Sequence, residues 1–409
     1  MIYNESKYNQ QWDTKKLSDL GTFERGKSKH RPRNDERLFH GGGYPLVQTA
    51  EIKDANLYIT HHEQEYGEFG LNQSKLWDAE TLCITIAANI AETALLSYPM
   101  CFPDSVVGFK AYKDASSEKF MYYVFEYIRR SIQNSVTGSI QDNINIEYLT
   151  SLTFKIPSKK IQDTIVSLLS AIDEKILINS EINDYLEEMA KTIYDYWFVQ
   201  FDFPDDNGKP YKSSGGALLY NEVLKKEIPF GWTIDTLGNL LSKVPNSTKI
   251  PATDFYDKGS IPVIDQSSDF IAGYTDNETS LLYNKTGYIV FGDHTRVVKY
   301  IRFPFARGAD GTQVINSNNR CMPNELFYQV IKSIDLSNYG YARHFKYLKD
   351  TIIAIPSAKL ANIYAEKVGK WYENQVSIMK ENNALSQLRD WLLPMLMNGQ
   401  ATIEERNAK

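Results

Sequence analysis

Basic and amide side chains gather in a few short, turn-rich stretches, and their chemistry suits the binding of a polyanion. One stretch, "GKSKHRPR" (26–33), contains Lys27, Lys29, His30, Arg31 and Arg33. Arg and Lys donors match the edge of guanine, Asn and Gln match adenine, and further cations hold phosphates. A single basic run is more often a solvated surface, so this stretch by itself only suggests a nucleic-acid contact.

The second half of the chain carries residues of the same types. "DHTRVVKYIR" (293–302) alternates as a strand does, which puts His294 and Arg296 on one face and Lys299 on the other. The loop "YGYARHF" (339–345) matches "TGSIQDNIN" (137–145) of the first half. Besides the five residues above, the candidate contacts are Gln48, Thr49, Gln141, Asn143, His294, Thr295, Arg296, Lys299, Arg302, Arg343, His344 and Lys346. Because such stretches recur in both halves, they favour binding of double-stranded DNA.

No catalytic signature accompanies these residues. The sequence lacks a phosphate-binding Gly-x-x-x-x-Gly-Lys-Ser/Thr loop, a His-Glu-x-x-His zinc helix and the Asn/Asp-Pro-Pro-aromatic tetrapeptide of adenine methyltransferases. Asp293 and His294 are adjacent, and neighbours on a strand point to opposite faces, so an acid–base pair is disfavoured. The three cysteines are too few and too widely spaced for a metal site or a disulfide framework. We therefore expect a binding protein without a catalytic residue, metal or cofactor of its own.

The net charge weighs against DNA binding, but its distribution weakens that objection. The formal net charge is −6, yet residues 159–200 alone carry four Lys and eight Asp or Glu. Residues 22–37 carry six Lys or Arg against three acids. The acidity thus belongs largely to one helical segment and the basic clusters to globular parts. No apolar run approaches the roughly 18 residues of a membrane helix, so we expect a cytoplasmic protein.

The elements that must position these residues occur twice. Trp12 opens "WDTKKLSDLG" and Trp232 opens "WTIDTLGNLL", while "EYLTSLTFKIPSKK" (147–160) returns as "KYLKDTIIAIPSAK" (346–359). Between these markers each half has short β-like runs and one apolar helix, at 118–133 and at 324–334. The repeat predicts two α+β domains, each followed by a long helical segment.

The two helical segments carry apolar residues at alternating steps of four and three, which is typical of a coiled coil. The predicted seam residues are Ile161, Ile165, Leu168, Ile172, Ile182, Leu186, Met189, Ile193, Leu360, Tyr364, Trp371, Ile378, Leu385, Leu388 and Leu392. We expect the helices to run antiparallel, because a parallel pair would require the connecting chain to travel back their whole length. Two amphipathic helices, each packed on its own domain, are the alternative.

In combination, these features resemble the DNA-specificity subunit of Type I restriction–modification systems over essentially the full length. The resemblance rests on "IPSKKIQDTIVSLLSAIDEKI" (156–176), "IPFGW" (228–232), "IPSAKL" (355–360) and "LRDWLLPMLMNGQ" (388–400). One departure is Asn362, which stands where the first copy has Gln162. The resemblance implies two target-recognition domains joined by two long antiparallel coiled-coil helices, related by a pseudo-twofold repeat. The expected segments are a first recognition domain (1–155), a spacer helix (156–200), a linker (201–230), a second recognition domain (231–354), a second spacer helix (355–400) and a tail (401–409).

The resemblance further implies a function and partners. Each domain would read one half of a bipartite DNA target, and the helices would dock modification subunits that bind S-adenosylmethionine and methylate adenine. A restriction subunit would join to cleave unmodified DNA, as a defence against foreign DNA. A self-contained methyltransferase or nuclease and a coiled-coil scaffold without DNA specificity are the alternatives from the residues alone.

Overall fold

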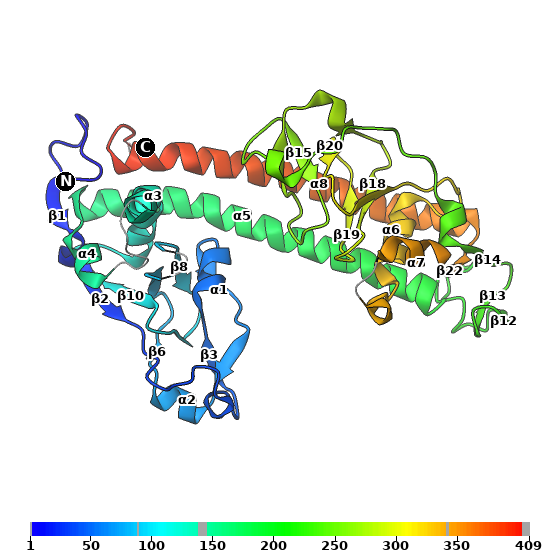
Figure 1. Ribbon diagram of the computed structural model, residues 1–409, viewed down its shortest axis with the longest axis horizontal. Helices are drawn as coiled ribbons and strands as arrows, with labels where there is room; N and C mark the ends of the chain where they lie inside the picture. The colour runs from blue at the N-terminus through cyan, green and yellow to red at the C-terminus, as the bar shows by residue number, and fades with distance from the viewer. Residues whose placement is uncertain (1, 88–89, 138–144, 341–342, 403–409) are drawn as a thin grey trace. The chain divides into compact units, whose positions relative to one another are not determined.

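The computed structural model describes residues 2–87, 90–137, 145–340 and 343–402 and divides the chain into two compact units. Unit 1 comprises Met1–Asn179 and Glu381–Lys409, and unit 2 comprises Ser180–Lys380. The division cuts both long helices, so each unit contains one globular domain together with a stretch of each helix (Figure 1).

The domain of unit 1 is built on two small sheets covered by helices. Their strand orders are β2-β10-β7-β8-β4 and β5-β3-β9-β6, and β1 pairs with β11. The strands are β1 (Asp13–Lys16), β2 (Gly21–Arg25), β3 (Tyr44–Leu46), β4 (Tyr58–Ile59), β5 (Gln64–Tyr66), β6 (Leu76–Trp77), β7 (Leu82–Thr85), β8 (Thr93–Leu96), β9 (Met100–Cys101), β10 (Val106–Ala111) and β11 (Thr153–Ile156). The helices are α1 (Thr49–Asp54), α2 (Glu68–Asn72), α3 (Glu118–Thr137), α4 (Ile146–Ser151) and α5 (Lys159–Tyr194).

The domain of unit 2 repeats this plan with a four-stranded and a three-stranded sheet in place of five and four strands. Its sheets have the orders β16-β15-β20-β17 and β19-β18-β21, and β14 pairs with β22. The strands are β12 (Leu218–Asn221), β13 (Lys226–Pro229), β14 (Thr233–Thr236), β15 (Ile261–Ile264), β16 (Gly273–Thr275), β17 (Leu281–Leu282), β18 (Tyr288–Gly292), β19 (Val298–Ile301), β20 (Phe305–Arg307), β21 (Thr312–Ile315) and β22 (Ile352–Ile355). The helices are α6 (Asn324–Ser333), α7 (His344–Asp350) and α8 (Ala358–Met397).

The repeat seen in the sequence is therefore a structural repeat. In unit 1 the strand after Trp12 pairs antiparallel with the strand before α5, with Asp13 opposite Ile156. In unit 2 the strand after Trp232 pairs in the same way with the strand before α8, with Thr233 opposite Ile355. Each pairing closes a domain at the point where its long helix begins. The prediction of two α+β domains and two long helices is confirmed.

The helices pair antiparallel within each unit. In unit 1 Asn179 donates to Asn382 (2.8 Å) and Arg389 donates to Asp173 (2.8 Å). In unit 2 Gln375 donates to the carbonyl of Asn183 (2.9 Å), while the Tyr364 hydroxyl donates to the carbonyl of Ala190 (3.1 Å). As residue numbers rise along α5 they fall along α8, as expected for antiparallel helices.

The predicted heptad seam coincides only partly with the buried stripe. Ile165, Ile172, Leu360 and Tyr364 are buried. Leu186, Ile193, Trp371, Ile378, Leu385 and Leu392 are half-buried. Five predicted seam residues are exposed: Ile161, Leu168, Ile182, Met189 and Leu388. Since each helix packs on a domain as well as on its partner, the buried surface is wider than an a/d seam and takes in Leu169, Ile176, Ala361, Val368 and Tyr372.

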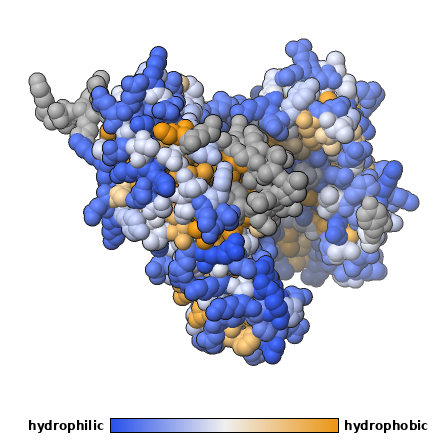
Figure 2. Space-filling model, turned by 60° about the vertical axis from the view of Figure 1, so that its left-hand side comes forward, coloured by the Kyte–Doolittle hydropathy of each residue, from blue (hydrophilic) through white to orange (hydrophobic). Residues whose placement is uncertain are grey.

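The visible surface is mostly hydrophilic, and hydrophobic residues form small separate areas on it (Figure 2). Within the described ranges, no helix is long and apolar enough to cross a membrane.

Candidate nucleic-acid interface

The turn between β18 and β19 is the best-defined candidate contact surface in unit 2. It contains Asp293, His294, Thr295 and Arg296. Asp293 is buried, and its main-chain carbonyl accepts hydrogen bonds from both the backbone N–H and the Nδ1 of His344 (2.9 Å each). Its carboxylate accepts a hydrogen bond from the backbone N–H of Phe345 (2.9 Å). These bonds fix the turn to the start of α7.

Around this turn lie exposed polar and basic side chains from two segments of the chain. His294, Thr295 and Arg296 are exposed on the turn itself, and Arg343 and Lys346 are exposed at the start of α7. Because Asp293 ties the turn to α7, residues some fifty positions apart in the sequence form one surface. The structure thus brings together five of the candidate contacts predicted in the second half of the chain.

The structure places three other predicted contacts in structural roles. His344 is 3% exposed, and its two ring nitrogens face the carbonyl oxygens of Asp293 and Gly340. Lys299 is 4% exposed, and its ammonium donates to the carbonyls of Asp265 and Asp269. Arg302 is directed onto α8, as described below. All three side chains bond within unit 2, so the structure gives them structural roles and we do not propose them as DNA contacts.

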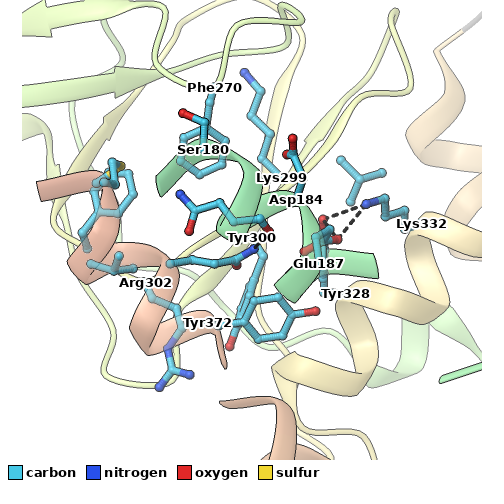
Figure 3. A pocket seen from close by; sticks show the side chains of 16 residues that line it. Ser180, Asp184, Glu187, Phe270, Lys299, Tyr300, Arg302, Tyr328, Lys332 and Tyr372 are labelled. Carbon is cyan, nitrogen blue, oxygen red and sulfur yellow. Dashed lines mark hydrogen bonds and ion pairs between the residues drawn. The ribbon is translucent and has the colours of Figure 1, made fainter. Parts of the chain in front are cut away.

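Arg302 and Lys299 flank a cavity of about 450 Å³ inside unit 2, where the domain meets the two long helices (Figure 3). The two cationic groups point away from each other in this view. Arg302 donates to the carbonyl of Gly369 (2.8 Å) and to Glu373 (3.0 Å), both on α8. On the opposite wall Glu187 of α5 accepts from Lys332 (2.7 Å). These charged groups are paired with other groups of the protein. The cavity is therefore part of the packing interface between the domain and the two long helices.

The burial of Lys299 gives a prediction that separates structural from DNA-contacting cations. Burial lowers the pKa of Lys299, while the nearby Asp265 and Asp269 favour its charge. In Lys299→Ala two carbonyl groups lose their donor, and we expect a loss of about 1–3 kcal/mol in the free energy of unfolding. Urea unfolding measures the loss, and DNA affinity of the folded fraction should stay the same.

Lys346→Ala is the matched control for Lys299→Ala, since Lys346 is exposed on the same domain. It should leave the free energy of unfolding within about 0.5 kcal/mol of wild type and weaken DNA binding instead. If Lys299→Ala weakens DNA binding without loss of stability, then Lys299 contacts DNA and does not have a structural role.

In unit 1 the predicted basic loop is largely paired with acids. Arg31 and Arg33 both lie against Asp104, at 3.5 and 2.6 Å, and Lys27 lies 3.7 Å from Glu24. Lys29, by contrast, is exposed and makes no hydrogen bond or ion pair with another described residue. The free positive charge of this loop is therefore smaller than its sequence suggests.

His30 anchors the same loop. Its Nε2 lies 2.8 Å from Asp35, and its backbone N–H donates to Gln73 (3.0 Å). Hydrogen bonds from Arg37 first, and from His30 second, hold the pKa of the Asp35 carboxyl well below its usual range. The charged carboxylate at the base of the loop holds His30 in place. It thereby also positions the backbone from which the neighbouring arginines extend.

The remaining candidates of the first half are placed as follows. Gln48 is exposed just before α1 and donates to Gln64 (2.7 Å), and Thr49 is half-buried at the first position of that helix. Gln141 and Asn143 lie outside the described residues.

Two residues that position the candidate contacts were missed by sequence reasoning. Asp104 holds two arginines of the basic loop, and Gln266 accepts a hydrogen bond from the backbone of His294 (3.2 Å). Gln266 follows β15 closely, much as Gln48 follows β3, so the matched strands could have indicated it. No sequence signal marks Asp104, because its partners lie about seventy positions away. Within the described residues, no cluster of His, Cys, Asp or Glu could hold a metal ion.

Comparison with known proteins gives one consistent result. The family model for the Type I restriction modification DNA specificity domain matches residues 9–188. The Type I restriction enzyme MjaIX specificity subunit of Methanocaldococcus jannaschii is 24% identical over 96% of this chain and 94% of its own length. The HindI specificity subunit of Haemophilus influenzae is 22% identical over 67% of this chain and 74% of its own length. The crystal structure of a Type I system S subunit from M. genitalium shares the fold, with a TM-score of 0.58, 16% identity and coverage of 97% and 99%.

Proposed function

We propose that this chain is a specificity subunit of a Type I restriction–modification system and that its two domains each read one half of a bipartite DNA target. The observation that carries the proposal is the structural repeat. The same pairing of strands closes both domains, while the loops between them carry different side chains. Two modules of one plan with different contact residues suit two half-sites of different sequence.

The contact chemistry supports the same proposal. In unit 2 Arg296, Arg343 and Lys346 are exposed on one surface, and in unit 1 Lys29 and the arginines held by Asp104 lie on one loop. Cations of this kind hold phosphates, and arginine forks in addition read guanine. The chain itself would supply recognition and no catalytic residue.

We further propose that α5 docks the modification subunits. Within unit 2, its exposed apolar residues Ile182, Tyr185 and Met189 are followed by Tyr196 and Val199 on a π-helical turn (Asp195–Val199). Their spacing of three, four, seven and three residues puts them on one face of the helix. An exposed apolar stripe of this kind is typical of a protein–protein contact. S-adenosylmethionine would bind to those partners, and a restriction subunit would complete the complex.

Exchange of residues 233–354 for the second domain of a related subunit tests independent reading. We expect methylome sequencing of cells with the modification subunits to show a motif with one half replaced and the other half and the spacer length unchanged. The wild-type chain and a reciprocal exchange of the first domain serve as controls. A change in both halves would contradict independent reading, and a single continuous wild-type motif would contradict the proposed function.

A further inference from the structure

Arg296 is held in a backbone conformation that an arginine rarely adopts. Its φ is +63°, in the left-handed region where a Cβ atom crowds the following carbonyl. Glycine adopts this conformation without that cost. Residues held in such conformations cluster at functional sites, because the surrounding structure must offset the strain. The turn would therefore be more stable with glycine at this position, yet the sequence has arginine.

The first domain has a comparable pair of hydrogen bonds between β7 and β8, although its connection is two residues longer. In unit 2 Arg296 N–H donates to the carbonyl of Gly292, and Gly292 N–H donates to that of Val297 (2.8 Å each). In unit 1 Ala91 N–H donates to the carbonyl of Thr85, and Thr85 N–H donates to that of Glu92 (2.9 Å each). Ala91 also has a left-handed φ, of +62°.

The two equivalent residues differ in what they expose. Ala91 is buried, at 1% exposure, in the core of the first domain, whereas Arg296 is exposed. The left-handed backbone is therefore common to both domains, and the exposed guanidinium belongs to the second alone. A shared phosphate-binding device would carry a cation in both domains. The two connections thus differ in length and in the side chain that they expose, as expected of two domains that read different sequences.

Hydrogen bonds hold the residues around Arg296 in place, while its guanidinium is exposed and available to a binding partner. The Thr295 hydroxyl donates to the carbonyl of Gln266 (2.6 Å), and the Asp293 N–H donates to the carbonyl of Gly311 (2.7 Å). A Cβ on Gly311, whose φ is +61°, would meet the Gln266 side chain at 2.5 Å, so glycine lets the two loops pack closely. The Arg296 guanidinium donates no hydrogen bond to another described residue. Hydrogen bonds from Ser337 lower the pKa of Asp335, and the charge of Arg296 adds a smaller contribution.

We propose that Arg296 is a specificity-determining residue that reads a guanine in the major groove of the second half-site. This inference rests on the proposed function and deepens it. Arginine is the residue whose fork donates to both O6 and N7 of guanine, and a rigid turn holds that fork in one place. A bidentate contact gives discrimination of about 1–3 kcal/mol, which is about five-fold to 150-fold in affinity.

The test uses Arg296→Gly in the complex with the modification subunits. Glycine removes the fork and relieves the backbone, so Tm should be unchanged or higher than in wild type. The methylated motif should lose its preference at one G·C pair of one half-site, by about five-fold to 150-fold in binding competition, and the other half-site should be unchanged. Arg296→Lys keeps the charge and should lose the same preference with a smaller loss of overall affinity.

Arg320→Ala is the matched control, since Arg320 is an exposed arginine of the same unit outside this turn. It should leave the motif unchanged. An unchanged motif in Arg296→Gly would overturn the inference. A uniform loss of affinity for all sequences, with a smaller dependence on salt, would also overturn it and make Arg296 a phosphate contact. If the wild-type complex produced no bipartite motif, the proposed function would fail first, and this inference with it.

Discussion

Arg389→Ala should cost about 3–5 kcal/mol in the free energy of unfolding of unit 1, because it leaves a buried carboxylate without its cation. Asp173 of α5 is 3% exposed, and it accepts hydrogen bonds from Arg389 of α8 (2.8 Å) and from the Tyr123 hydroxyl of α3 (2.7 Å). Burial disfavours the charge of Arg389, yet Asp173 more than offsets this and raises the pKa of the guanidinium. Denaturant unfolding at neutral pH measures the loss.

Lys175→Ala is the control for this prediction. Lys175 also joins α5 to α8, through Glu381 at 3.7 Å, but both side chains are 47% exposed. An exposed pair contributes about 0–1 kcal/mol, so this variant should remain close to wild type. Equal losses in the two variants would show that the Asp173 site is open to water in solution.

A double substitution separates the role of the pair from that of its charge. Asp173→Leu combined with Arg389→Met replaces both charges by apolar groups, and such replacements of buried pairs are often neutral or stabilising. We expect it to recover most of the stability lost in Arg389→Ala. The double variant would instead align α3, α5 and α8 less uniquely, because a buried polar pair specifies alignment better than an apolar contact does.

The structural repeat was predictable because its markers are local. Ile-Pro-Ser stands at the same point of both halves, where a strand ends and a long helix begins, and proline and serine suit the start of a helix wherever it packs. The antiparallel pairing followed from chain connectivity alone. The length of each long helix was also predictable, because the apolar periodicity continues through each segment.

The heptad pattern did not predict which residues of the two long helices are buried. Leu168 fits the steps of four and three but is 36% exposed, whereas its neighbour Leu169 is fully buried. Leu169 packs in the core of the first domain, and a coiled-coil pattern takes no account of contacts with a domain. The two-sided packing of each helix thus decides which leucine is buried.

Among the candidate contacts, neither the alternation in the sequence nor the residue type predicted the placement of Lys299 and Arg296. The pattern predicted one strand through residues 293–302, but residues 293–297 form a turn and β19 begins at Val298, so strand alternation does not explain why Lys299 is buried and Arg296 is exposed. Lysine is almost never fully buried, so its type favoured an exposed contact. Its partners are two carbonyl groups about thirty residues away, and backbone acceptors leave no signature in a sequence.

Asp293→Ala should weaken DNA binding through the position of Arg296, although Asp293 itself is buried and negatively charged. The substitution removes the acceptor of the Phe345 N–H (2.9 Å) at the start of α7, which we expect to cost about 1–3 kcal/mol in the free energy of unfolding. It also frees the turn from the helix, so DNA affinity and preference at one base pair should fall together. Fluorescence anisotropy at several salt concentrations should show an unchanged salt dependence, because no phosphate contact is lost. Asp293→Asn keeps an acceptor oxygen and should recover most of both losses. Lost stability with unchanged affinity and unchanged preference would instead place this turn away from DNA.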